Sequence, residues 1–187
     1  CQILREIQDR EACEIGSHLH PWNTLPTNEP IDSYLSYMCN LDPDVQRRKL
    51  EHLTNSIVNR LGVRATSFRA GRYGLDATGA RFLVDLGYLV DSSVCPFMDY
   101  SPDGGPNYLG FPYKPYFIGE SFGIPSRVRT DLLEVPVSFG FNWSQFDRAF
   151  SVHETLAHPL LRPLRLRGIS ERLGLLKKIK FSPEKHR

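Results

Sequence analysis

Residues 14–22 read EIGSHLHPW, which places two histidines one residue apart, after a short apolar run and just before a proline. On an extended backbone successive side chains alternate between the two faces, so His18 and His20 should point the same way. Neutral imidazoles that converge in this manner are good ligands for zinc and similar divalent ions. An isolated pair of this kind is usually two ordinary histidines near a strand end, so the surrounding chain decides between the two interpretations.

The segments on either side of the histidines suit an active site in an α/β protein. Residues 2–10 have the apolar spacing of a helix, and residues 13–16 predict a strand that ends at the histidine pair. Residues 21–30 are rich in Pro, Asn and Thr, which predicts a loop. A functional residue at a strand end, followed by a long loop, is a common arrangement in α/β barrels.

A helix is predicted from residue 43 to residue 61. Asp42 can cap its first turn, Pro43 suits the first helical position, and Gly62 is a good stop. Between these signals, four apolar residues recur at spacings of three and four: Leu50, Leu53, Ile57 and Leu61. This stripe should pack against a sheet.

A second strand, loop and helix follow. Residues 66–68 predict a strand that leads into Arg69 and a glycine-containing turn, and residues 76–86 predict a helix that ends at Gly87. Residues 88–90 predict the next strand, with Asp91, Ser92 and Ser93 at its end. Repeated strand–loop–helix units with short apolar strands predict an α/β fold with a mostly parallel sheet.

Residues 95–130 form a long segment rich in Pro, Gly and aromatic residues, with almost no periodicity. Such a segment inside a compact domain is usually functional. Its aromatic side chains either stack on a flat ligand such as a sugar ring or pack on one another to hold the segment together. They are Tyr100, Tyr108, Phe111, Tyr113, Tyr116 and Phe117.

The last third of the chain is less informative. It predicts a strand at residues 132–138, a helix within residues 143–161, a short helix at residues 173–176 and a strand that begins at Ile179 and includes Phe181.

Length and composition indicate one globular domain over residues 1–187, with 41% hydrophobic and 24% charged residues. No apolar run is long enough to cross a membrane. The absence of a signal segment favours a cytoplasmic location. From Arg162 onward there are 9 Lys/Arg and 2 Asp/Glu, so this stretch either contacts a membrane surface peripherally or is simply a solvated face, and we expect the second. No nucleic-acid motif accompanies it.

Three motifs together resemble the NodB-homology polysaccharide deacetylases, a family of metal-dependent amidohydrolases and esterases. EIGSHLHPW is similar to the family's histidine motif, FRAGRY at residues 68–73 to its arginine motif, and GYLVDSS at residues 87–93 to the strand end that borders its substrate pocket. The family places its second histidine four positions after the first, where this chain has Trp22, so the chain resembles an HxHPW branch.

This resemblance implies a distorted (β/α) barrel, and an enzyme that removes acetyl groups from N-acetylated or O-acetylated carbohydrate with a divalent metal, zinc being expected. His18 and His20 would bind the metal, with His18 the firmer ligand, and Arg69 would orient the catalytic base. The carbohydrate would contact four residues: Trp22, Tyr73, Asp91 and Ser92.

The family's aspartate pair on the first strand, and its late histidine acid, have no counterpart among these residues. We therefore expect a barrel truncated at both ends, weak metal binding and no activity from this chain alone. Two alternatives remain open: a noncatalytic relative that binds glycans, and a hydrolase of a small non-peptide amide. The oligomeric state is not indicated by the sequence.

Overall fold

The computed structural model describes residues 2–10, 13–27, 32–119 and 121–180. The chain divides into two compact units, Cys1–Val137 and Ser138–Arg187. The assignment of residues 1–187 to a single domain stays a prediction. Each unit is described separately below.

Five strands form the sheet of the first unit, in the order β1-β2-β3-β5-β4. The first four of these run parallel, and the last pairs antiparallel with its neighbour. The strands are β1 (Ser17–Leu19), β2 (Ser67–Ala70), β3 (Val90–Asp91), β5 (Leu133–Glu134) and β4 (Tyr116–Phe117). The predicted α/β fold with a mostly parallel sheet is confirmed, and it is consistent with an incomplete (β/α) barrel.

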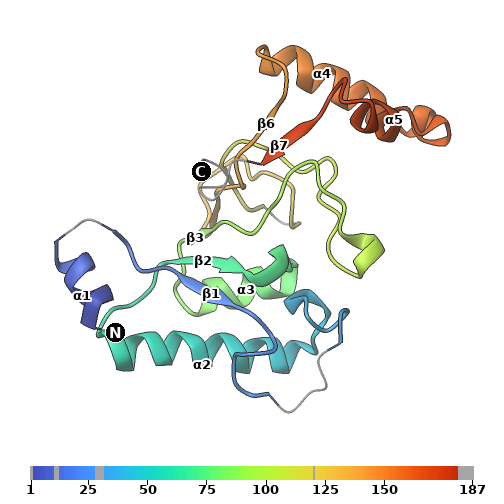
Figure 1. Ribbon diagram of the computed structural model, residues 1–187. Coiled ribbons are helices and arrows are strands. Elements are labelled where there is room, and N and C mark those ends of the chain that lie inside the picture. Colours follow the sequence, from blue (N-terminus) through green and yellow to red (C-terminus); the bar gives the residue numbers. More distant parts are fainter. Residues whose placement is uncertain (1, 11–12, 28–31, 120, 181–187) are drawn as a thin grey trace. The chain divides into compact units, whose positions relative to one another are not determined.

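Two helices cover one face of this sheet, and both begin and end where their sequence signals predict. Helix α2 (Pro43–Leu61) is capped by Asp42, whose side chain accepts from the backbone N of Asp44, and it ends at Gly62 in the left-handed region with φ 72°. Helix α3 (Ala77–Asp85) packs against α2, and Figure 1 shows both beside β1 and β2. A shorter helix, α1 (Gln2–Asp9), precedes β1.

The core lies between these helices and the sheet. Leu19 from β1, Phe68 from β2, Leu50 from α2 and Leu83 from α3 are each at most 2% exposed. Burial alternates along β1, where Ser17 and Leu19 are buried and the residue between them is exposed. One face of the sheet is therefore closed by helices, and the other presents its side chains outward.

Two predictions about the sheet are corrected. Residues 13–16 are not a strand: β1 begins at Ser17, so His18 lies within the strand rather than after it. The aromatic segment also contains β4 and a 3-10 turn, η3 (Ser101–Asp103), which its composition did not predict. A strand this short is defined by its partner, β5, and leaves no periodic signal.

The second unit holds a two-stranded antiparallel sheet of β6 (Phe139–Phe141) and β7 (Lys178–Lys180), with α4 (Phe146–Ala157), η4 (Pro159–Leu164) and α5 (Leu166–Arg172) between them. The short helix lies at 166–172, so its prediction at 173–176 is wrong. The predicted strand that includes Phe181 is seen as β7, and Phe181 itself lies outside the described residues. In the described parts of the chain, no helix combines the length and apolar character that a membrane span requires.

Candidate functional site

The two histidines of the opening motif meet at the carboxyl end of β1. Nε2 of His18 lies 2.9 Å from Nε2 of His20, and the ring centroids are 4.5 Å apart. Both side chains lie on the face of the sheet opposite the helices, because His18 alternates with the buried residues of β1. The predicted convergence of the two imidazoles is present in the structure.

A hydrogen bond fixes the tautomer of the first histidine. Nδ1 of His18 donates to the backbone carbonyl of Arg69 at 2.8 Å. In the neutral ring this leaves the lone pair on Nε2, the atom that faces His20. A hydrogen bond from the ring nitrogen that does not bind the metal is how proteins orient a metal-binding histidine.

His20 is held by packing instead. Its Nδ1 is buried and has no hydrogen-bond partner among the described residues. Burial, and secondarily the neighbouring His18, lowers the pKa of His20, which favours a neutral imidazole. The ring lies against Gly71, where an added Cβ would be 2.7 Å from Cε1 of His20.

Arg69 lies beside the histidines, since it pairs with His18 in the β1–β2 register. Its guanidinium donates from Nε to the carbonyl of Ser92 at 2.9 Å and from Nη2 to the Ser92 hydroxyl at 2.7 Å. A guanidinium has five N–H donors, so others remain to orient a carboxylate. The side chains of His18, Arg69 and Ser92 line an open hollow of about 410 Å³.

The loop after the histidines is fastened to α2 by a buried lysine. Nζ of Lys49, which has no exposed surface, donates to the carbonyls of Pro21, Thr24 and Pro26. Trp22 stands on this loop with its ring 4.2 Å from that of His20 and 43% of its surface exposed. A large apolar surface is thus available next to the histidine pair.

The aromatic segment folds largely onto itself. Tyr108 is fully buried, packs edge-on against Phe111 and donates its hydroxyl to the carbonyl of Tyr73 at 2.5 Å. Phe111 packs in turn against Phe122. Tyr73 is half-buried and stacks at 6.0 Å on Tyr100. Of the two interpretations of this segment, mutual packing is the one that these contacts favour.

Asp91 occupies a different position from the other predicted site residues. In the strand register it pairs with Phe68, which belongs to the covered face, and it has no exposed surface. The next residue, Ser92, lines the hollow beside His18 and Arg69, whereas Asp91 does not. The neighbouring strand contributes Glu134, also fully buried, and this carboxylate was not predicted. The roles assigned to the sequence-predicted residues stay predictions.

The donor set fits part of a divalent metal site. Two imidazole nitrogens converge, and His18 carries a supporting hydrogen bond of the usual kind. Within the described ranges, no group of three or more His, Cys, Asp or Glu side chains could hold an ion. A complete site would need at least one further ligand.

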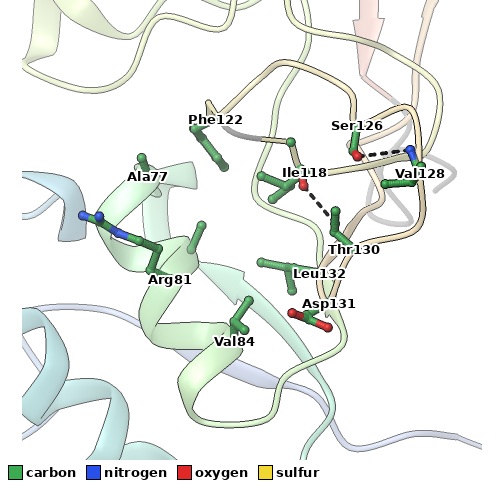
Figure 2. Close-up of a pocket in the computed structure, with 12 residues that line it drawn as sticks. Ala77, Arg81, Val84, Ile118, Phe122, Ser126, Val128, Thr130, Asp131 and Leu132 are labelled. Carbon is green, nitrogen blue, oxygen red and sulfur yellow. Dashed lines mark hydrogen bonds between the residues drawn. The ribbon is translucent and has the colours of Figure 1, made fainter.

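A larger hollow, of about 550 Å³, lies elsewhere in the first unit, between α3 and residues 118–132 (Figure 2). Its lining is mainly apolar, with Ala77 and Val84 on the helix side. Two of its polar groups are already used within the loop, since Thr130 donates to the carbonyl of Ile118 and Ser126 accepts from Val128 (Figure 2). Its titratable lining residues are Arg81 and Asp131, and among the described residues no histidine lines it.

Comparisons with known proteins add a likeness in structure. No protein family profile matches the chain, and no curated protein sequence matches it. Among solved structures, it is similar to the "Crystal structure of putative polysaccharide deacetylase from Mycobacterium smegmatis", with 21% sequence identity and a TM-score of 0.44. The match covers 73% of this chain and 35% of the other, so the chain spans about a third of the length of the structure it matches.

Proposed function

We propose that this chain contributes the histidine and arginine side of a metal-dependent hydrolase that removes acetyl groups from N-acetylated or O-acetylated carbohydrate. The observation that carries the proposal is the convergence of Nε2 of His18 and Nε2 of His20 at 2.9 Å, with the first ring anchored to the carbonyl of Arg69. A divalent metal bound there, zinc being expected, would polarise the acyl carbonyl and lower the pKa of a water molecule.

The chain's own residues would bind and orient. His18 and His20 would hold the ion as neutral donors, and Arg69 would hold a catalytic carboxylate ionised through a charge-assisted hydrogen bond. Trp22 would form an apolar wall for a sugar ring, which its exposed ring beside His20 supports. Ser92 and Tyr73 would border the same space.

The test compares the 187-residue chain with the longest natural protein that contains it. Bound metal is measured after purification, and acetate release is measured from N-acetylated and O-acetylated oligosaccharides. We expect the 187-residue chain to bind metal weakly and to release no acetate. We expect the longer protein to bind metal and to release acetate. A longer protein with neither metal nor acetate release would overturn the proposal.

A matched pair of variants locates the site. His18→Ala in the longer protein should lower acetate release on the order of 100-fold or more, because removal of a residue that only hydrogen-bonds to a metal ligand already costs roughly 10–100-fold. His52→Ala removes an exposed histidine on α2 and should leave the rate unchanged. Equal rates in the two variants would exclude the histidine pair as the metal site.

A noncatalytic glycan-binding protein is the second candidate, and the exposed face of Trp22 is the observation that favours it. Such a protein would bind oligosaccharides with an affinity that Trp22→Ala weakens and His18→Ala leaves intact. The enzyme requires both side chains. A small non-peptide amide as the substrate would appear as turnover of simple acetamides without turnover of oligosaccharides.

A further inference from the structure

Asp91 and Glu134 place two carboxyl groups side by side inside the fold. They are direct partners in the parallel β3–β5 register, and neither has any exposed surface. Their row of the sheet includes Phe68, so they lie on the covered face, opposite His18 and Arg69. Two ionised carboxylates buried next to each other would be strongly unfavourable.

The hydrogen bonds around the pair distinguish its four carboxyl oxygens. Asp91 accepts twice from Ser93, from the hydroxyl to Oδ1 at 2.6 Å and from the backbone N to Oδ2 at 3.1 Å. Glu134 accepts at Oε1 from the backbone N of Val94 at 3.0 Å. Buried Oε2 of Glu134 has no hydrogen-bond partner within the described residues. Both oxygens of Asp91 and Oε1 of Glu134 therefore already accept hydrogen bonds, which leaves Oε2 of Glu134 as the oxygen of the pair that can carry a proton.

We propose that Glu134 and Asp91 form a buried acid pair that shares one proton, carried on Oε2 of Glu134, and that this pair positions Arg69 and the histidine that Arg69 anchors. The claim that the pair positions Arg69 rests on the function proposed above, because that function gives Arg69 and the histidines a common role. The claim that the pair holds a proton does not depend on that function.

A continuous set of contacts joins the acid pair to the histidines. The Ser93 hydroxyl, oriented by Asp91, accepts from the backbone N of Ala70 at 2.8 Å. Arg69 precedes Ala70 in the chain. Its carbonyl accepts a hydrogen bond from Nδ1 of His18, and its guanidinium donates to Ser92. Asp91 therefore orders Ser93, and Ser93 holds the end of β2 at Ala70. The same end of β2 holds His18 through the carbonyl of Arg69.

The electrostatics of the surroundings agree with a retained proton. Burial raises the pKa of Asp91 and of Glu134, and the neighbouring Asp91 raises the pKa of Glu134 further. Tyr116 pairs with Glu134 in the β4–β5 register. Burial, and secondarily the two carboxyl groups, raise the pKa of Tyr108 and of Tyr116, so both phenols stay neutral. Arg69 lowers the pKa of Glu134, but burial and the neighbouring Asp91 raise it more, and the guanidinium of Arg69 is engaged with Ser92 on the open face.

The first test detects the proton directly in the whole chain. Infrared spectra of wild type at neutral and mildly alkaline pH should contain a protonated-carboxyl C=O band that Glu134→Gln removes. The control Glu51→Gln removes an exposed carboxylate on α2, 42% exposed, and should leave the band in place. A wild-type chain without the band would overturn the proposal.

The second test uses the pH dependence of unfolding. Gln at position 134 keeps an oxygen for Val94 and supplies an N–H for Asp91, so it imitates the protonated acid without titrating. The unfolded chain releases the Glu134 proton above its ordinary pKa, whereas the folded chain keeps it. The urea midpoint of wild type should therefore fall relative to that of Glu134→Gln as the pH rises above about 5. Parallel pH profiles would contradict the proposal.

The third test reports on positioning. The ¹⁵N chemical shifts of the His18 ring should be unchanged in Glu134→Gln and should move toward those of a freely exchanging tautomer in Asp91→Asn, which loses one acceptor for Ser93. Equal spectra in these two variants would refute the positioning role. None of these readouts requires metal or substrate: a protonated pair in a protein without deacetylase activity would sink only the function, and deacetylase activity without the infrared band would sink only the acid pair.

Discussion

Replacing Gly71 with alanine should separate the two histidines without changing either of them. A Cβ at this position would lie 2.5 Å from the carbonyl oxygen of Leu19 and 2.7 Å from Cε1 of His20. Real side chains do not approach this closely, so one neighbour must move. Leu19 belongs to β1 and is paired with Ala70 in the sheet, which leaves the His20 ring as the group that can shift.

The expected cost follows from the crowding. Overfilling a packed site costs roughly 1–3 kcal/mol, and we expect Gly71→Ala to lower the free energy of unfolding by that amount. A ring displaced by even a few tenths of an ångström loses the 2.9 Å approach to Nε2 of His18. Urea unfolding gives the first quantity, and ¹⁵N spectra of the histidine rings report the second.

Gly168→Ala is the matched control. Gly168 lies in α5, and nothing is within 4 Å of the Cβ that alanine would add. Alanine in a helix is favoured over glycine by about 0.5–1 kcal/mol, so this variant should be neutral or slightly more stable, with unchanged histidine spectra. If Gly71→Ala behaves as Gly168→Ala does in both measurements, the close approach of Gly71 to His20 is not what holds the pair.

Three further outcomes are expected from contacts within each of the two units. Lys49→Met should destabilise the chain by at least about 2 kcal/mol in urea unfolding, because it leaves three carbonyls without their buried donor; a loss as small as that of exposed Lys177→Met would contradict the role of Lys49. Leu83→Ala, at a position with no exposure, should cost roughly 2–5 kcal/mol, and a change below about 1 kcal/mol would mean that α3 is not part of the core. Burial lowers the pKa of His153 to about 4, so the unfolded chain takes up a proton first as the pH falls below about 6.5, and the second unit should lose roughly 1.4 kcal/mol of stability per pH unit down to about pH 4. In a Trp22→Phe background Trp143 is the remaining tryptophan, and its fluorescence should show this acid-induced loss in wild type and not in His153→Leu.

The parts of the fold that could be predicted are those written in local sequence. Helix α2 begins at Pro43 and ends at Leu61 because a capping carboxylate, a proline and a glycine all act within a turn of its ends. The meeting of His18 with His20 follows from the two-residue period of an extended chain. Neither inference needs knowledge of a distant segment.

The parts that could not be predicted depend on pairing between distant segments. The strand containing Glu134 was anticipated, but the burial of its carboxylate follows from its register with Asp91, which lies 43 positions earlier in the sequence. The same register places Asp91 on the covered face although Ser92, its neighbour, faces the hollow. Strand β4 exists only as the partner of β5. The isolated glutamate of the sequence LEVP carries no signal that a second acid will lie beside it.

Lys49 has a consequence for how the site responds to its surroundings. Three backbone carbonyls converging on one positive charge form an oxygen cage of the kind that proteins otherwise build around a dissolved potassium or sodium ion. Here the cation is the ammonium group of a side chain, so the carbonyls need no ion from solution. The loop that carries Trp22 should accordingly keep its shape in potassium, sodium or salt-free buffer.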